Sequence, residues 1–296
     1  MKSAILCVYY VPVDMEWVFK LQLEHIRKFS PKNTYKIYAA IIKCFASIET
    51  QLRTANDVII CDVIADHKNP SKQHSMALTQ LMNAALSDGR EEIFTLDVDS
   101  FPIQKNWMNL MVTKAKKNSG VCAVHRIENG DVFLPHPCGA LILASFVHKY
   151  PFEFFPENIE SAGSEFLSET NQRADSGIGL ALSLSLWKNK QPWSELPRSN
   201  HLNMHYLIAG VYGDVIFHLG AGSREPIFSK EIKTNSLMKA TSPLKKTPVL
   251  WHLHSLIEKG VEMYYTRKNR QIINNVQREL VRNSEVFINT LRCQTT

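Results

Sequence analysis

The stretch Glu92-Ile93-Phe94-Thr95-Leu96-Asp97-Val98-Asp99-Ser100-Phe101-Pro102 decides the fold of this chain. A β-favouring run precedes two carboxylates and a Phe-Pro pair follows them, which predicts Asp97 and Asp99 at a strand end. Side chains at i and i+2 of an extended segment point the same way, so both carboxylates can reach one crevice at the carboxyl edge of a parallel sheet. Such oxygen ligands suit Mg²⁺ or Mn²⁺, which complete their shells with substrate phosphates. The alternative is that the two carboxylates are solvated, or cap a helix beginning near Lys105.

The composition indicates a globular protein that handles anionic ligands. The chain has 296 residues, 45% of them hydrophobic, which is ample for a core. Its net charge of +6 suits nucleotide phosphates and also favours an anionic membrane surface, without indicating nucleic acid. We expect a cytoplasmic location, since no signal-peptide pattern or membrane-spanning run is evident.

The cysteines form no CxxC pair and lie mostly in apolar runs. We therefore expect them to be reduced and buried. They are Cys7, Cys44, Cys61, Cys122, Cys138 and Cys293.

The first half of the chain alternates strand-like and helix-like segments. This alternation predicts an α/β fold with a mostly parallel sheet and helices on both faces. Early strands are expected at 3–10, 35–42, 57–64 and 92–96, with helices at 15–29 and 73–86 and a short helix near 47–53. Later we expect a helix at 106–117, strands at 121–124 and 139–144, a loop at 157–170 and a helix at 176–188.

From residue 229 the sequence becomes polar, basic and helix-compatible. We therefore expect a main domain at 1–228 and a helical C-terminal extension at 229–296. The apolar positions of the extension would pack on the core or on a partner, which allows self-association or peripheral membrane contact. These positions are Ile272, Ile273, Val276, Leu280, Val281, Val286 and Phe287.

A second candidate site lies in the stretch 212–224, which reads YGDVIFHLGAGSR. Here a short strand ends in His218, two glycines free the backbone, and Arg224 can meet a phosphate. A neutral His218 imidazole would be a third metal ligand compatible with Mn²⁺ if its strand ends near Asp99. The alternative is a hydrogen-bonded core histidine. Two other pairs compete for the ligand role, His252 with His254 and His201 with His205.

Five pieces in order resemble the GT-A glycosyltransferases, particularly family 2. They are the tyrosine-ended first strand, Ser71-Lys72-Gln73-His74, Leu96-Asp97-Val98-Asp99 with Phe101-Pro102 and Trp107, Asp175-Ser176-Gly177, and the stretch from Phe217 to Arg224. The resemblance covers about residues 1–225 and implies a Rossmann-like nucleotide-diphospho-sugar transferase fold. It leaves the C-terminal extension unexplained.

The resemblance also implies roles for the acidic residues. Asp97 would contact the donor ribose or a metal-bound water, Asp99 would bind the metal, and His218 would complete the coordination. Asp175 would be the general base that takes the proton of the acceptor hydroxyl. The competing interpretation of Asp175 is a helix N-cap.

On the nucleotide side, the resemblance implies contacts from several segments. Lys72 and His74 would face the phosphates, although for Lys72 a solvated helix end is the stronger alternative. Tyr9, Tyr10 and Val11 would flank the base, and Val98 and Arg224 would contact the donor. The acid often found after the second strand is missing, because Ile41-Ile42-Lys43 stands there, and Asp62 is expected to replace it.

The function implied is an inverting glycosyltransferase that uses Mn²⁺ or Mg²⁺ to move a sugar from a nucleotide-diphosphate donor to a hydroxyl acceptor. The acceptor is left open between a glycan, a lipid-linked molecule and a small molecule. The alternatives are a retaining enzyme resembling family 8 and a non-catalytic nucleotide-sugar-binding protein. A nucleotidyltransferase would usually carry a glycine-rich basic loop after the first strand, where this chain has Tyr9-Tyr10-Val11-Pro12-Val13.

Overall fold

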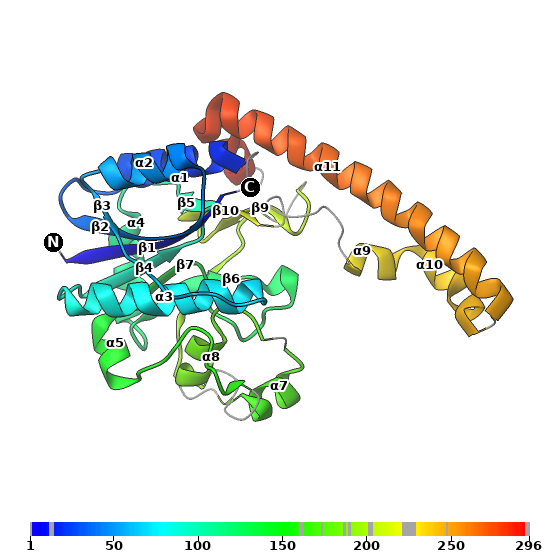
Figure 1. Cartoon of the computed structure of the whole chain (residues 1–296), viewed down its shortest axis with the longest axis horizontal. Coiled ribbons are helices and arrows are strands. Elements are labelled where there is room, and N and C mark those ends of the chain that lie inside the picture. Colours follow the sequence, from blue (N-terminus) through cyan, green and yellow to red (C-terminus); the bar gives the residue numbers. More distant parts are fainter. Residues whose placement is uncertain are drawn as a thin grey trace.

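The computed structural model describes residues 2–11, 15–159, 163–172, 174–185, 188, 191–200, 204–220, 229–246 and 248–293. Its centre is a seven-stranded sheet in the order β3-β2-β1-β4-β7-β6-β8 (Figure 1). The strands are β1 Ser3–Tyr10, β2 Tyr35–Lys43, β3 Val58–Ile60, β4 Glu92–Leu96, β6 Val121–His125, β7 His136–Leu143 and β8 Ser194–Pro197. All neighbours pair parallel except β7, which runs antiparallel to β4 and β6. The predicted mostly parallel sheet is thus confirmed.

Helices cover both faces of this sheet, as the alternation of strands and helices predicted. One face packs against α1 (Glu16–Phe29), α2 (Ala46–Thr54) and α4 (Trp107–Lys116). The other packs against α3 (Pro70–Ser87), α5 (Ala144–Lys149), α7 (Ser164–Thr170) and α8 (Ile178–Leu184). The side chains of β1 alternate between the two, with Ile5, Cys7 and Tyr9 in the first core and Ala4, Leu6 and Val8 in the second.

A second, smaller sheet joins two distant parts of the sequence. It is antiparallel, in the order β5-β10-β9, and consists of β5 (Ser100–Pro102), β9 (Ile208–Tyr212) and β10 (Ile216–Gly220). β5 begins directly after Asp99, and its Ser100 pairs with His218 of β10. The pairing therefore brings His218 beside the acidic loop, although 119 positions separate Asp99 from His218.

The C-terminal extension is helical, as predicted. It consists of α9 (Ser229–Thr234), α10 (Ser236–Thr241), a 3₁₀ segment (Ser242–Lys246) and α11 (Pro248–Cys293). Figure 1 shows α11 running from a projecting end, where α10 lies beside it, back to the main body. Near its C-terminus the helix is interrupted at Asn283, whose φ of −164° and ψ of 92° are not helical.

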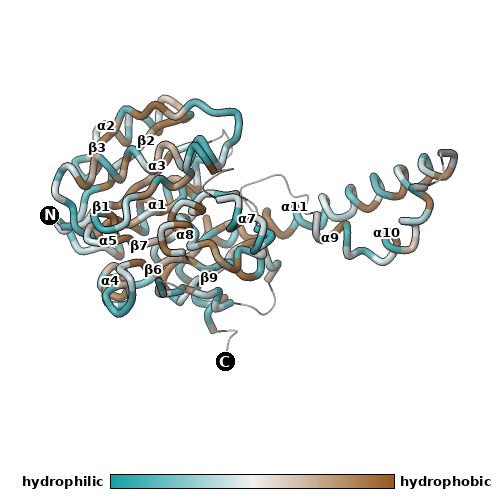
Figure 2. The backbone as a smooth tube through the Cα atoms, turned by 90° about the horizontal axis from the view of Figure 1, so that it is seen from below, coloured by the Kyte–Doolittle hydropathy of each residue, from teal (hydrophilic) through white to brown (hydrophobic). Residues whose placement is uncertain are grey.

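Among the described residues, the last part of α11 is the part that packs on the main body. There, Val276, Leu280, Ile288 and Leu291 are buried against the small sheet. Figure 2 shows hydrophobic segments concentrated in the main body, while the projecting part of α11 alternates between hydrophilic and hydrophobic positions. Within the described ranges, no helix combines the length and apolar content needed to cross a bilayer.

Several element boundaries differ from the sequence predictions. The strand expected at 57–64 is only Val58–Ile60, an edge strand with a single neighbour. The expected loop at 157–170 contains α7, and β8 was not predicted. The helix expected at 176–188 spans Ile178–Leu184 and ends at Ser185, where φ is 50°.

The cysteines are free, as expected, where the structure describes them, but they are not all buried. Cys7, Cys122 and Cys138 are buried, whereas Cys44 and Cys61 are half-buried near strand ends. The Cys293 side chain lies outside the described part.

Candidate functional site

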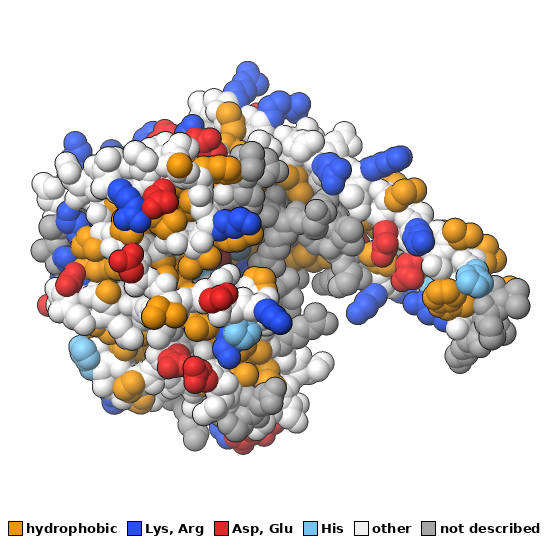
Figure 3. Space-filling view, viewed as in Figure 1, with side chains coloured by type: hydrophobic (Ala, Val, Ile, Leu, Met, Phe, Trp, Pro, Cys, Tyr) orange, Lys and Arg blue, Asp and Glu red, His pale blue; other side chains and the backbone are white. Residues whose placement is uncertain are grey.

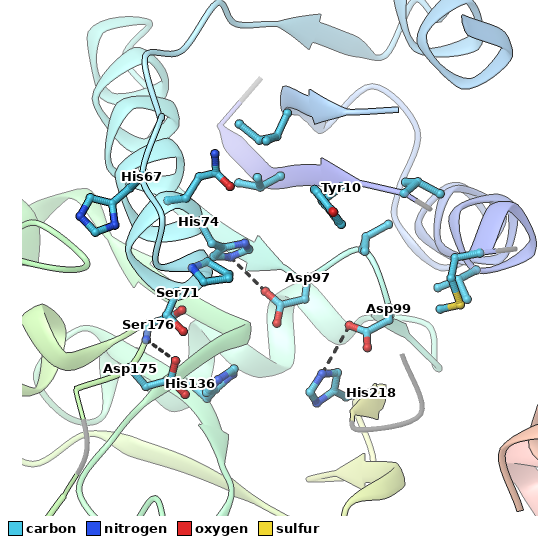
Figure 4. A pocket seen from close by; sticks show the side chains of 18 of the residues that line it. Tyr10, His67, Ser71, His74, Asp97, Asp99, His136, Asp175, Ser176 and His218 are labelled. Atoms are coloured by element: carbon cyan, nitrogen blue, oxygen red, sulfur yellow. Dashed lines mark hydrogen bonds and ion pairs between the residues drawn. The ribbon is translucent and has the colours of Figure 1, made fainter. Parts of the chain in front are cut away.

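A cavity of about 650 Å³ lies where β1 and β4 end and α3 begins (Figure 4). Parallel strands present their carboxyl ends at this edge, so side chains from several of them converge on one space. Figure 4 shows polar side chains entering this space from separate elements. They are Tyr10, His67, Ser71, His74, Asp97, Asp99, His136, Asp175, Ser176 and His218.

The acidic loop is fixed by hydrogen bonds from neighbouring elements. The buried Gln22 amide on α1 donates to the Asp97 carbonyl at 2.5 Å and to the Ser100 carbonyl at 3.1 Å. The Ser100 backbone N–H also donates to the Asp97 carbonyl, at 2.9 Å, and the Leu219 N–H donates to the Asp99 carbonyl at 2.9 Å. The Ser100 hydroxyl bonds the Cys138 carbonyl. Both carboxylates thus stand on a backbone that is braced from α1, β7 and β10.

Each carboxylate of the loop faces a histidine. Asp99 Oδ1 lies 3.4 Å from His218 Nε2, and both side chains are buried. Asp97 Oδ1 lies 3.3 Å from His74 Nε2 in the first turns of α3. Neither of these two atoms has a hydrogen-bond partner among the described residues. Both atoms are buried and meet each other in this ion pair, which fixes the Asp97 carboxylate and the His74 ring at the wall of the cavity.

The structure adds Cys138 to the potential metal ligands. Asp97, Cys138 and His218 each offer one ligand atom, and these three atoms lie within 4.8 Å of one another. Asp99, which the sequence analysis placed in the ligand set with Asp97 and His218, contacts His218 but is outside this group. Carboxylate, imidazole and thiolate are all ligands of divalent transition metals, so the donor set fits a cation of that class.

The charges in the cavity shift the pKa values of these groups. Burial alone would raise the pKa of Asp97, but the positive charge of the adjacent His74 outweighs burial and lowers that pKa. Burial would lower the pKa of His218, but the neighbouring Cys138 and Asp99 raise it to about 10. The pKa of Cys138 is raised, chiefly by burial. A cation would compete with protons for the last two groups.

Asp175 enters the cavity from the other side. Its Oδ1 accepts a 2.7 Å hydrogen bond from the Ser176 N–H, and its Oδ2 lies 3.5 Å from the Arg126 guanidinium. Burial would raise the pKa of Asp175, but the charges of His136 and Arg126 and the bond from Ser176 lower it overall. The carboxylate is therefore the form expected at neutral pH.

The helix-capping alternative for Asp175 does not match the geometry. α8 begins at Ile178, and its N-cap position is Gly177, with φ of 103°. The Asp175 side chain bonds the adjacent Ser176 rather than the first turn of α8. Asp175 is therefore not the N-cap of α8.

The residues expected to contact the nucleotide are only partly brought together. Tyr10, Val11, Val98 and His74 line the cavity. Tyr9 does not, because strand alternation turns it into the opposite core, edge-on to Phe19.

Asp62 and Lys72 are also not among the cavity-lining residues. Asp62 is exposed beyond the short strand β3, while the neighbours of Lys72 on both sides line the cavity. Arg224 and Gly222 lie outside the described residues. His218 is not at a strand end as expected, because β10 continues to Gly220, which has the predicted glycine conformation with φ of 66°.

The competing histidines lie elsewhere. His205 is paired with Glu231 at 3.0 Å, and the buried His254 contacts the Thr241 hydroxyl at 3.2 Å. His252 is exposed beside Trp251 on α11. His201 lies outside the described residues.

Sequence reasoning missed His136, which lines the cavity, and Cys138, which belongs to the possible ligand group, because both depend on which strand pairs with β4. His136 and Cys138 stand at i and i+2 on β7, which pairs with β4 through Leu96 and Gly139. The alternation His136-Pro137-Cys138 before an apolar run was a usable signal for two side chains on one face of a strand. His67 and Lys68 line the cavity just before α3 and carried no comparable signal, whereas Ser71 opens the Ser71-Lys72-Gln73-His74 stretch that carries part of the resemblance.

Comparisons with known proteins found similarity only among solved structures. No family model matches the chain, and no curated protein matches it. Staphylococcus aureus TarS 1–349 in complex with UDP-GlcNAc aligns at 12% identity and a TM-score of 0.43, over 66% of this chain and 56% of TarS 1–349.

Two further structures align over similar parts of the chain. The galactosyltransferase LgtC with donor and acceptor sugar analogues aligns at 10% identity and a TM-score of 0.42, over 65% of this chain and 73% of LgtC. GlyE of Streptococcus pneumoniae TIGR4 aligns at 14% identity and a TM-score of 0.40, over 66% of this chain and 45% of GlyE. Similarities at this level do not define an activity.

Proposed function

We propose that this chain is a metal-dependent glycosyltransferase that moves a sugar from a nucleotide-diphosphate donor to a hydroxyl acceptor, with inversion at the sugar. The observation that carries the proposal is the arrangement of the cavity. Asp97 and Asp99 face it from the loop after β4, His218 faces it from β10, and Asp175 faces it from the opposite side. The sequence resemblance to GT-A enzymes implies the same four residues, from positions far apart in the chain.

The residues that would hold the cation are Asp97, Asp99, Cys138 and His218. Asp97, Cys138 and His218 offer a carboxylate, a thiolate and an imidazole atom within 4.8 Å of one another, and Asp99 adjoins this group through its 3.4 Å contact with His218. A divalent ion bound there would neutralise the charge that accumulates on the leaving nucleoside diphosphate. Gln22 and Ser100 keep the acidic loop in place while the donor binds.

The nucleotide would occupy the part of the cavity between β1 and α3. Tyr10 and Val11 at the end of β1 offer a surface for the base, and Val98 adjoins them. Lys68 and Ser71, around the N-terminus of α3, offer an ammonium and a hydroxyl to the phosphates.

Asp175 would take the proton of the acceptor hydroxyl as the bond to the sugar forms. Inversion needs a carboxylate on the side opposite the leaving group, and Asp175 lies across the cavity from Asp99 and His218 (Figure 4). Arg126 also pairs with Asp131 at 2.6 Å, so a fixed cation keeps the Asp175 carboxylate charged and oriented.

We also propose that residues 1–228 form the transferase domain and 229–296 an extension with a separate role. The residues that line the cavity all lie between Val8 and His218. The extension contacts the main body chiefly through the small sheet and α1.

The experiment is a screen of nucleotide-diphosphate sugars for release of UDP or GDP, with and without Mn²⁺, using wild type and Asp175→Asn. We expect Mn²⁺-dependent hydrolysis of at least one donor by wild type. With an acceptor present, transfer by Asp175→Asn should be at least about 100-fold slower. Equal turnover by both proteins would remove Asp175 from the mechanism, and a retained anomeric configuration in the product would make the enzyme a retaining one. Nucleotide binding without hydrolysis of any donor would instead indicate a non-catalytic binding protein.

A further inference from the structure

The projecting part of α11 exposes apolar side chains on the face that points away from the other helices of the extension. Leu253, Leu256, Met263 and Tyr264 are 49%, 67%, 59% and 60% exposed. With Gly260 and Arg267, their spacing of three and four residues puts them on one side of the helix, which we call the outer face. Met263, Tyr264 and Arg267 also line a hollow there.

The opposite face of the same segment is already occupied. His254, Val261 and Asn269 are buried, at spacings of seven and eight residues. His254 contacts Thr241 at the end of α10, and Asn269 donates to Glu231 of α9 at 2.7 Å. The short helices α9 and α10 therefore cover this buried face, which we call the inner face. The apolar outer face makes no contact that holds the extension together among the described residues.

This segment carries nearly all of the net positive charge of the protein. Residues 236–271 contain seven Lys or Arg and two Asp or Glu, a net charge of +5 within a chain whose total is +6. The basic side chains Lys239, Lys259, Arg267, Lys268 and Arg270 are exposed. Figure 3 shows basic and hydrophobic side chains gathered along the projecting part of the molecule.

The combination of charge and apolar surface selects the kind of partner. A second copy of this segment would bring like charges together, which opposes self-association through this face. A nucleic acid would attract the basic side chains, but its phosphates would leave leucine and methionine uncovered. An anionic lipid surface satisfies both, because apolar side chains enter the acyl boundary while lysine and arginine remain among the headgroups.

We propose that the outer face of α11 docks the protein peripherally on an anionic lipid membrane. The helix lies flat on the surface and does not cross it. α11 projects on the side of the main body toward which β1 runs, the side of the sheet edge where the cavity lies (Figure 1).

The test is flotation of the full chain with vesicles of phosphatidylcholine, with or without phosphatidylglycerol. We expect wild type to float with the anionic vesicles and to dissociate in high salt. Replacing apolar side chains of the outer face in the combined variant Leu253→Gln, Leu256→Gln and Met263→Gln should lower the bound fraction at least about fivefold. Glutamine keeps helix propensity close to that of leucine and methionine, so helix content by circular dichroism should be unchanged.

The matched control is Val281→Gln with Val286→Gln on the same helix. Both valines are 59% exposed but lie near the docked end, outside the outer face. This variant should float like wild type. Replacing Lys259, Arg267 and Arg270 with Gln should remove the preference for anionic vesicles.

Three results would overturn the proposal. The first is wild type that stays with the unbound protein in both vesicle preparations. The second is equal loss of flotation in the outer-face variant and in the valine control. The third is a concentration-dependent dimer in sedimentation velocity that the outer-face variant abolishes, which would assign the face to a second copy. Nucleotide-dependent activity is not needed for any of these measurements, so their outcome is separate from that of the proposed transferase function.

Discussion

The cavity and the projecting part of α11 depart from the usual distribution of side chains in opposite ways. In the cavity, charged groups are buried, as in Asp99 and His218, each 5% exposed. On the outer face of α11, apolar groups are exposed, as in Leu256 at 67%. Burying a charge and exposing an apolar side chain both cost free energy that a ligand can recover, but the ligands differ. Ions and phosphates suit the first region, and a lipid surface suits the second.

The two regions also differ in how they are held. The acidic loop is braced by Gln22 and Ser100 and by the pairing of β5 with β10. Among the described residues, the projecting part of α11 contacts α9, α10 and the 3₁₀ segment of the extension. Changes in one region should therefore leave the function of the other intact. The following predictions test the properties that distinguish the buried, braced parts of the molecule from the exposed outer face.

The largest effect is expected from Asp99→Asn. Losing the charge that faces His218 should lower donor turnover at least about 100-fold, a loss comparable to that of a preorganised electrostatic group in other active sites. Steady-state release of the nucleoside diphosphate measures it. Asp62→Asn is the matched control, because Asp62 is an exposed acid outside the cavity. A twofold or smaller effect of Asp99→Asn would remove Asp99 from the site.

The next effect compares two leucines on the same helix. Leu280 is 1% exposed against the small sheet, whereas Leu256 is 67% exposed on the outer face. Leu280→Ala should lower the free energy of unfolding by about 2–4 kcal/mol, and Leu256→Ala should lower it by less than about 0.5 kcal/mol. Denaturant unfolding measures both. Equal losses would mean that the outer face is packed in solution.

A third prediction concerns the buried Cys138 thiol beside Asp97 and His218. Cobalt bound to wild type should show a thiolate-to-metal charge-transfer band, and Cys138→Ser should remove the band and weaken cobalt binding about tenfold. Cys61→Ser is the matched control, because Cys61 is outside the ligand group. Retention of the band in Cys138→Ser would assign the sulfur ligand to another cysteine. If neither protein showed the band and both bound cobalt equally well, the metal would have only oxygen and nitrogen ligands.

The smallest effect is a pH dependence at the docked end of α11. Burial lowers the pKa of His25 below 6.5, and its ring bonds the Pro102 carbonyl and the Ser284 hydroxyl. The unfolded chain therefore binds a proton more readily than the folded chain. The stability from this group is fully present above the unfolded pKa and is lost as the pH falls toward the folded pKa.

His25→Gln should remove this dependence. Between about pH 7.5 and pH 5.5, wild type should lose roughly 1 kcal/mol more of its free energy of unfolding than the variant does. Denaturant unfolding at the two pH values gives the difference. Parallel losses in wild type and variant would show that other groups account for the acid sensitivity.

Local patterns predicted the main sheet well, but they did not predict the small one. β1, α1 and β4 carry their signals in 8, 14 and 5 consecutive residues, so periodicity identified them. β5 has three residues, and it is defined by its pairing with a strand more than a hundred positions later. Such pairings are set by tertiary packing, which a local pattern does not contain.

The same distinction separates the site residues that were predicted from those that were missed. Asp97 and Asp99 follow β4, Asp175 precedes α8 and His218 lies within β10. All four belong to motifs recognisable in the sequence, and all four line the cavity. His136 lines the cavity and Cys138 lies beside Asp97 and His218 because β7 runs antiparallel beside β4, an orientation that the alternation of elements did not indicate. The prediction that Tyr9 flanks the base was wrong, because the alternation of side chains along β1 turns Tyr9 into the core.

The most direct test of the central claim is calorimetric titration of wild type and Asp99→Asn with UDP and GDP, in the presence and absence of Mn²⁺. If a cation held near Asp97, Asp99 and His218 grips the diphosphate, wild type should bind one of these nucleotides at least about tenfold more tightly with Mn²⁺. The variant should lose that gain. Equal affinity with and without Mn²⁺ in wild type, or an undiminished gain in Asp99→Asn, would contradict the account.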